Sequence, residues 1–146
     1  MVICCDTSFL FSVYGYDGNT ESAHAFLKNV HAPISVSLFN GFELANAFRL
    51  AEFRRLIGKG DSSRFLEQYR QDAHDGRILE QPCNLAEVIK KAHELSARHT
   101  LRGGHRGFDI LQVAAALERG ATKFLTFDRL QNKLATGENL NVPFAI

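Results

Sequence analysis

Short apolar runs alternate with longer segments of helical periodicity along the whole chain. The apolar runs cover residues 2–5, 34–37, 77–80, 123–127 and a stretch near 142–145. Apolar residues recur every three or four positions between them, which predicts helices over 7–14, 21–30, 38–57, 64–74, 85–99, 108–119 and 128–135. Such alternation is typical of a parallel sheet with helices on both faces. We therefore expect a three-layer α/β/α fold with a mainly parallel central sheet of about five strands.

Composition is consistent with one globular domain spanning residues 1–146. The 45% hydrophobic and 23% charged content is ordinary for such a domain, and no repeat or linker divides the chain. The formal net charge of +1 is too small for binding nucleic acid by bulk charge. Any contact with nucleic acid would therefore need a local basic patch.

Several features favour a cytoplasmic protein without membrane association. No apolar run approaches the ~20 residues that span a bilayer. The start, MVICCDTSFLF, has no basic region and contains Asp6, which is unlike a signal peptide. The three cysteines lack the spacing of a zinc site or a disulfide framework, so we expect them to be reduced and buried.

Four acidic residues are predicted to meet at one edge of the sheet. Asp6 and Asp128 each follow a predicted strand, and ligand sites in parallel sheets lie beyond the carboxyl ends of the strands. Asp109 lies in the first turn of a helix that is apolar nearly all round and must be buried. Glu43 interrupts an apolar row of the helix 38–57. An acidic pocket is the expected result.

Each acid also has a purely structural explanation. Asp6 and Asp128 could be helix N-caps, worth about 1 kcal/mol each. Asp109 would be favoured by the helix dipole, and Glu43 could pair with an arginine of another element. Convergence of all four would instead create repulsion that a hard divalent cation, Mg²⁺ or Mn²⁺, removes. A metal held by carboxylates can activate water for phosphodiester hydrolysis.

A basic, glycine-rich segment precedes Asp109. Residues 98–107 read RHTLRGGHRG and are expected to form a flexible loop. Its Arg102, His105 and Arg106 are candidates for contacts with an RNA backbone. The alternative is a solvated connection between two helices, with His105 as a bystander rather than a general acid or base.

The sequence around these acids resembles that of PIN-domain nucleases. The matching segments are Asp6-Thr7-Ser8, FELANAF around Glu43, FDILQVAAAL around Asp109, and Thr126-Phe127-Asp128. The length is similar to that of stand-alone VapC-type toxins of toxin–antitoxin pairs. The resemblance implies a Mg²⁺- or Mn²⁺-dependent endoribonuclease, a homodimer, and inhibition by a cognate antitoxin whose C-terminal segment enters the acidic site.

The resemblance also implies roles for individual residues. The catalytic, metal-binding acids would be Asp6, Glu43, Asp109 and Asp128. The hydroxyls of Ser8 and Thr126 would orient an acid or a water, and Asn132 stands where some family members have another polar or acidic group. The segment LFNGF lacks the hydroxyl residue often found before the glutamate, and the basic segment is unusually glycine-rich. These departures affect the expected substrate rather than the four acids.

Two other functions fit the same residues. Asp6 could be the nucleophile of a phosphohydrolase, although Thr7 and Ser8 follow it instead of the second aspartate of a DxD motif. The pocket could alternatively belong to a non-catalytic module that recognises RNA or a basic peptide.

Overall fold

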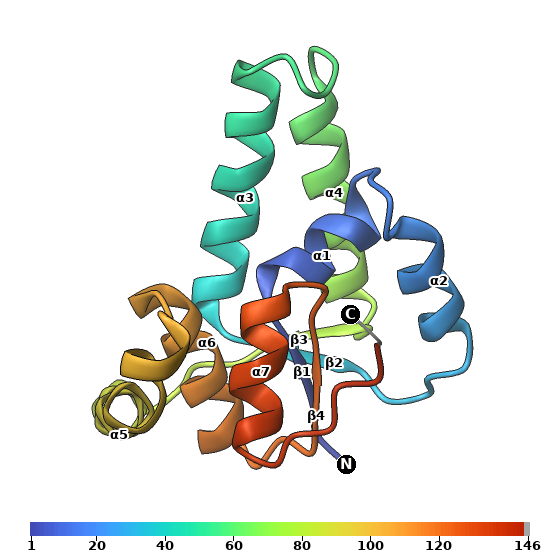
Figure 1. The fold of residues 1–146 in the computed structure, drawn as a ribbon. Helices are drawn as coiled ribbons and strands as arrows, with labels where there is room; N and C mark the ends of the chain where they lie inside the picture. The colour runs from blue at the N-terminus through green and yellow to red at the C-terminus, as the bar shows by residue number, and fades with distance from the viewer. Residues whose placement is uncertain (145–146) are drawn as a thin grey trace.

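The computed structural model describes residues 1–144, which form four strands and seven helices (Figure 1). In chain order these elements are β1 Ile3–Cys5, α1 Thr7–Tyr14, α2 Thr20–Lys28, β2 Ile34–Val36, α3 Leu38–Phe53, α4 Asp61–His74, β3 Ile78–Glu80, α5 Leu85–Gly103, α6 Gly107–Glu118, β4 Lys123–Leu125 and α7 Arg129–Gly137. In residues 1–144, no helix combines the length and apolar content needed to cross a bilayer.

The sheet is parallel throughout, with the strand order β3-β2-β1-β4. The chain builds outward from β1 to β2 and β3, and then returns to the other side of β1 to form β4. The direction of winding therefore changes between β1 and β4. In open parallel sheets, a crevice forms at the carboxyl ends of the strands at such a point. Asp6 and Asp128 follow these two strands.

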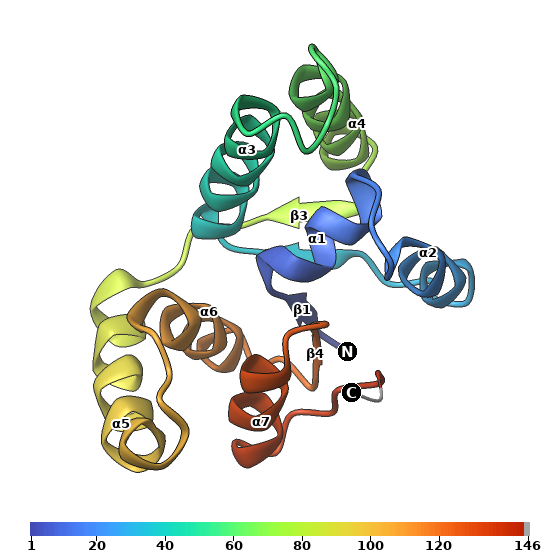
Figure 2. The same cartoon turned by 45° about the horizontal axis from the view of Figure 1, so that its top comes forward.

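Helices cover both faces of the sheet, which confirms the predicted three-layer architecture (Figure 2). Adjacent residues of a strand point to opposite faces. Cys5 belongs to a buried cluster with side chains of α1, α2, α3 and α4. Cys4 belongs to a second cluster with side chains of α5, α6 and α7. The burial of both cysteines raises the pKa of each thiol.

The buried face of α3 differs from the predicted apolar row. Asn40, Leu44, Phe48 and Ala51 face the core, whereas Glu43 is only half-buried beside them. Apolar residues occur on several sides of this helix, so periodicity alone does not identify the side that is buried. The helix also ends at Phe53 rather than at residue 57, since Arg55 adopts a left-handed φ of 59° that cannot continue an α-helix.

The predicted fifth strand near 142–145 is wrong for the described residues. Asn141 makes an isolated parallel bridge to Lys123 at the edge of β4, and regular pairing goes no further. Pro143 has no backbone N–H to donate to a ladder, which accounts for the interruption. Residue 145 lies outside the described residues.

The predicted flexible loop at 98–107 is also wrong. Helix α5 continues past the predicted end at residue 99 to Gly103, so Arg102 is helical. Gly104 ends the helix with a left-handed φ of 65°, a conformation that glycine adopts without steric cost. The non-helical connection to α6 contains only residues 104–106.

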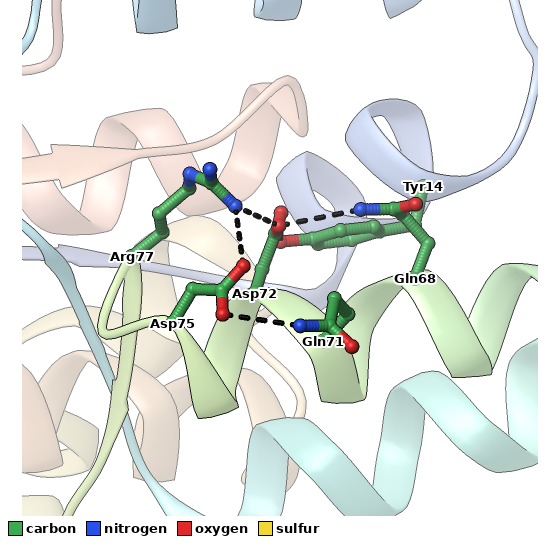
Figure 3. A network of polar contacts seen from close by, with 6 residues as sticks. All are labelled: Tyr14, Gln68, Gln71, Asp72, Asp75 and Arg77. Atoms are coloured by element: carbon green, nitrogen blue, oxygen red, sulfur yellow. Dashed lines mark hydrogen bonds and ion pairs between the residues drawn. The ribbon is translucent and has the colours of Figure 1, made fainter.

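A polar network joins α1 to the corner between α4 and β3 (Figure 3). The Tyr14 hydroxyl donates to Asp72 Oδ2 at 2.7 Å, and Arg77 pairs with Asp72 at 2.9 Å and Asp75 at 3.2 Å. Burial raises the pKa of Tyr14, so its hydroxyl remains protonated and keeps donating. This network lies at the amino ends of β2 and β3 and holds two helices together.

Candidate acidic active site

All four predicted acids line one cleft of about 250 Å³ at the carboxyl ends of the strands. The residues that line it are Asp6, Thr7, Ser8, Glu43, Ala47, Arg106, Asp109, Gln112 and Asp128. They come from the ends of β1 and β4, from the helices α1, α3 and α6, and, for Arg106, from the connection just before α6. Residues more than 100 positions apart in the chain therefore meet in this cleft.

Asp6 is the most enclosed of the four acids, with 4% of its surface exposed. Its Oδ1 accepts hydrogen bonds from Phe9 N at 3.1 Å and Ser8 Oγ at 2.7 Å, and its Oδ2 accepts one from Thr126 Oγ1 at 2.5 Å. Burial raises the pKa of Asp6 to about 6. The three hydrogen bonds oppose this rise, and the charge of Asp128 adds to it. Asp6 is thus a buried carboxylate held next to another acid.

Two hydroxyls connect Asp6 to the end of β4. Besides donating to Asp6, Thr126 Oγ1 accepts from Asp128 N at 3.0 Å, and Ser8 Oγ accepts from Phe127 N at 3.2 Å. Thr126 is fully buried. These bonds fix the position of the segment that carries Asp128 relative to Asp6.

Asp128 is the N-cap of α7. Its Oδ1 accepts a hydrogen bond from Gln131 N at 2.9 Å. Gln131 is buried and its amide nitrogen donates to the backbone carbonyl of Asp109 at 3.1 Å. Helix α7 therefore positions Asp128 and also contacts the backbone at Asp109.

Glu43 is held by Gln112. The Gln112 Nε2 donates to Glu43 Oε1 at 2.6 Å. The same amide contacts α1, where Nε2 donates to Thr7 Oγ1 at 3.2 Å and Oε1 accepts from Thr7 N at 3.3 Å. The partner of Glu43 is therefore a neutral amide rather than the arginine considered from the sequence.

Asp109 lies in the first turn of α6, as predicted, and pairs with Arg106 Nε at 3.3 Å. The Arg106 side chain is 80% exposed, so solvent weakens this pair. A carboxylate at this position is also favoured by the helix dipole. The acid is therefore retained in the cleft without a strong permanent counter-charge.

The donor set fits a hard divalent cation. The cleft offers four carboxylates, and among the described residues that line it Arg106 is the one positive charge. The raised pKa of Asp6 reflects a buried negative charge that a cation would stabilise. Within residues 1–144, however, no three carboxylate, imidazole or thiol groups are arranged to hold one ion together. Glu43 and Asp109 instead contact Gln112 and Arg106.

The other predicted site residues lie around or beyond the cleft. Asn132 donates through Nδ2 to the Phe144 carbonyl at 3.4 Å and does not line the cleft. Arg102 is exposed in the last turn of α5, outside the lining. His105 lies in the connection before α6, and burial together with the nearby His99 lowers its pKa. Of the three predicted RNA contacts, Arg106 alone lines the cleft.

Sequence reasoning missed the roles of Gln112 and Gln131. Gln112 interrupts the apolar run ILQVAAA of a buried helix, and an isolated polar residue in such a run is a detectable signal. Gln131 has no comparable signal, because its helix is polar at many positions.

A second cavity, of about 330 Å³, lies at the other end of the sheet. Its lining includes Phe9, Leu27 and Ile34, with Asp72 and Arg77 at the polar part. These two charged groups are already paired within the network of Figure 3. Asp72 and Arg77 therefore offer this cavity no unpaired charge.

Comparison with known proteins agrees with this fold. The chain is similar to a chain in the crystal structure of VapBC2 from Rickettsia felis bound to a promoter DNA fragment, with 16% identity, 97% of each chain covered and a TM-score of 0.67. It is also similar to a chain of FitAcB from Neisseria gonorrhoeae, with 17% identity, a TM-score of 0.61, and 97% of this chain and 96% of that chain covered. At such identities the likeness shows the fold alone, and no curated protein matches the chain. The sequence pattern of the PIN domain matches residues 3–137, from the first residue of β1 to the last of α7, and the chain therefore belongs to the PIN-domain family.

Proposed function

We propose that this protein is a metal-dependent endoribonuclease that acts as the toxin of a VapBC-type toxin–antitoxin pair in the cytoplasm. One observation carries the proposal: four carboxylates from separate elements line one cleft where the winding of the sheet changes direction. Membership of the PIN-domain family supports nuclease activity.

Asp6, Glu43, Asp109 and Asp128 would hold Mg²⁺ or Mn²⁺, which prefer oxygen ligands. When bound, the metal would lower the pKa of a water and stabilise charge on a phosphoryl oxygen. The protein's own contribution is positioning. Ser8 and Thr126 fix Asp6 by donating to it, which opposes the rise in its pKa, and Thr126 also holds the backbone at Asp128. Asn132, which lies on α7 one turn beyond Asp128, would support the acids from outside the cleft.

The RNA would approach along the side of the cleft where α5 and α6 meet. Arg106 lines the cleft and is largely exposed, so it can contact a phosphate near the scissile bond. Arg102 and His105 lie in the adjoining turns and would extend the contact along the backbone.

A protein partner is supported by exposed apolar residues on α3. Phe42 and Phe53 are 70% and 83% exposed, although burial of aromatic side chains is usual in protein interiors. The solved complexes that the chain resembles are VapBC2 and FitAcB. We propose a cognate antitoxin as the partner, and a homodimer of this chain as the form that binds it.

The central test is RNA cleavage by the purified chain with Mg²⁺ or Mn²⁺, with a chelator, and with Asp109→Asn. We expect cleavage that requires metal and falls on the order of 100-fold or more in the variant, because even outer partners of a metal contribute 10–100-fold. Unchanged cleavage by Asp109→Asn would refute the proposal. Absence of both cleavage and Mn²⁺ binding in the unaltered chain would favour the non-catalytic binding module.

Arg106→Ala should weaken RNA binding more than it alters the chemistry. Binding measured without metal should lose affinity, and the slope of log affinity against log salt should decrease by about 0.7, as for one phosphate contact on a single strand. Arg70→Ala on α4 is the matched control, because Arg70 is an exposed arginine in an i,i+3 pair away from the cleft. Equal effects of both substitutions would show that Arg106 contributes only bulk charge.

A further inference from the structure

We infer that Gln112 is the positioning residue of the acidic cleft, holding Glu43 against the start of α1 so that the acids share one geometry. The inference rests on the proposed metal-dependent function. Gln112 lies on α6, and in the proposed function it contacts neither the RNA nor the reacting atoms. Gln112 would act through Glu43.

The Gln112 amide is buried and all of its hydrogen-bonding groups are used. The side chain is 3% exposed. Its two N–H groups account for the contacts with Glu43 Oε1 and Thr7 Oγ1, and its oxygen accepts from Thr7 N. An amide has two donor hydrogens and one acceptor oxygen, so no group is left unpaired. Any other arrangement of this network would leave a buried polar group without a partner, which would cost free energy.

The backbone of Thr7 sets the direction of the amide. A backbone N–H can only donate, so the Gln112 oxygen must face Thr7. The nitrogen must then face Glu43, where it favours an oxygen acceptor such as an ionised carboxylate. Among the described residues, no hydrogen bond reaches Glu43 Oε2, so one oxygen is fixed and the other remains for the cleft.

Gln112 also links the elements that carry three of the four acids. It lies one turn after Asp109 on α6, and it reaches Thr7, the residue that follows Asp6. One side chain thereby relates the element of Asp109, the element of Asp6 and the carboxylate of Glu43. A displacement of Glu43 by about 1 Å is enough to disrupt a metal site that requires close geometry.

Gln131 provides a matched comparison within the same protein. It is also a helical glutamine, 1% exposed, and it also lies close to the acids. Its amide donates to the backbone carbonyl of Asp109 and not to a carboxylate. Loss of either amide should reduce the stability of the fold, whereas only the loss of Gln112 should act through Glu43.

The test is a double-mutant cycle on Mn²⁺ affinity, measured by calorimetry on the full chain. The proteins are the unaltered chain, Gln112→Met, Glu43→Gln and the double variant, with Gln131→Met as control. We expect Gln112→Met to weaken Mn²⁺ binding about 10- to 100-fold. We expect the double variant to bind no more weakly than Glu43→Gln alone, because the carboxylate that Gln112 positions is then absent. The effects of Gln131→Met and Glu43→Gln on Mn²⁺ affinity should instead multiply, because Gln131 does not act through Glu43.

The outcomes separate this inference from the proposed function. Unaltered Mn²⁺ binding by Gln112→Met, or a double variant weakened by the full product of the single effects, overturns the role of Gln112 alone. A wild-type chain that neither binds Mn²⁺ nor cleaves RNA overturns the proposed function and this inference with it. If Gln112→Met does not fold, Thr7→Val removes the hydroxyl that accepts from the amide nitrogen and leaves the backbone N–H of residue 7 in place. Alone, Thr7→Val should weaken Mn²⁺ binding. In a chain that already carries Glu43→Gln, it should have no further effect. An unchanged affinity in the single variant contradicts the inference.

Discussion

Replacement of Asp6 by asparagine is expected to stabilise the metal-free protein at neutral pH while it abolishes RNA cleavage. Burial raises the pKa of Asp6 from 3.8 to about 6, which corresponds to roughly 3 kcal/mol of cost for holding the charge in the folded state. Asparagine removes this charge. It keeps an oxygen for Ser8 and Phe9, and it remains a good N-cap for α1.

The gain in stability should depend on pH. Because the folded pKa lies above the unfolded one, the folded protein binds an extra proton between about pH 4 and 6. The contribution of Asp6 to stability is therefore present at low pH and is lost as the pH rises through 6. The advantage of Asp6→Asn over the unaltered chain should be largest above pH 7 and should shrink below pH 5.

Urea unfolding in the presence of a chelator, at pH 5.0 and 7.5, measures this difference. These two pH values lie on either side of the folded-state pKa of Asp6, which is about 6. Glu67→Gln is the control, because its carboxylate is exposed on α4 and, within residues 1–144, pairs with Arg70 alone. An Asp6→Asn protein that is less stable at both pH values, or a gain that does not change with pH, would contradict the expected cost of the buried charge.

The layers of the fold follow from the sequence because strand and helix periodicities differ strongly. The residues after β1 and β4 were predictable for the same reason, since Asp6 and Asp128 terminate short apolar runs. The catalytic role of these acids stays a proposal. The buried side of α3 was not predictable, since its apolar residues surround the helix and only tertiary packing, such as that of Phe48 against Phe11 of α1 and Phe65 of α4, selects the buried ones.

Contacts between distant residues account for most of the rest. Gln112 meets Thr7 across 105 positions and Glu43 across 69, and no local pattern encodes either pairing. Helix α5 continues through Gly103 because one glycine costs only about 1 kcal/mol in a helix, which packing along α6 can offset. The interrupted pairing at Pro143 depends on a missing N–H at the edge of the sheet, which an apolar pattern does not reveal.

Asp128 has two roles that a pair of substitutions can separate. As N-cap, its Oδ1 accepts from Gln131 N at 2.9 Å, and as one of the acids it lines the cleft. Asparagine retains an oxygen for the cap, whereas alanine retains none. Asp128→Ala should therefore lose about 1 kcal/mol of stability that Asp128→Asn keeps.

Both substitutions should reduce RNA cleavage on the order of 100-fold or more, because each removes a proposed metal ligand. The measurements are metal-dependent cleavage and chelator-treated urea unfolding on the same two proteins. If Asp128 serves only as a cap, Asp128→Asn will retain cleavage close to that of the unaltered chain, and the loss in Asp128→Ala will follow its loss of stability. Loss of cleavage in Asp128→Asn at unchanged stability instead separates the chemistry from the fold, because the helix cap is then intact while the charge is gone.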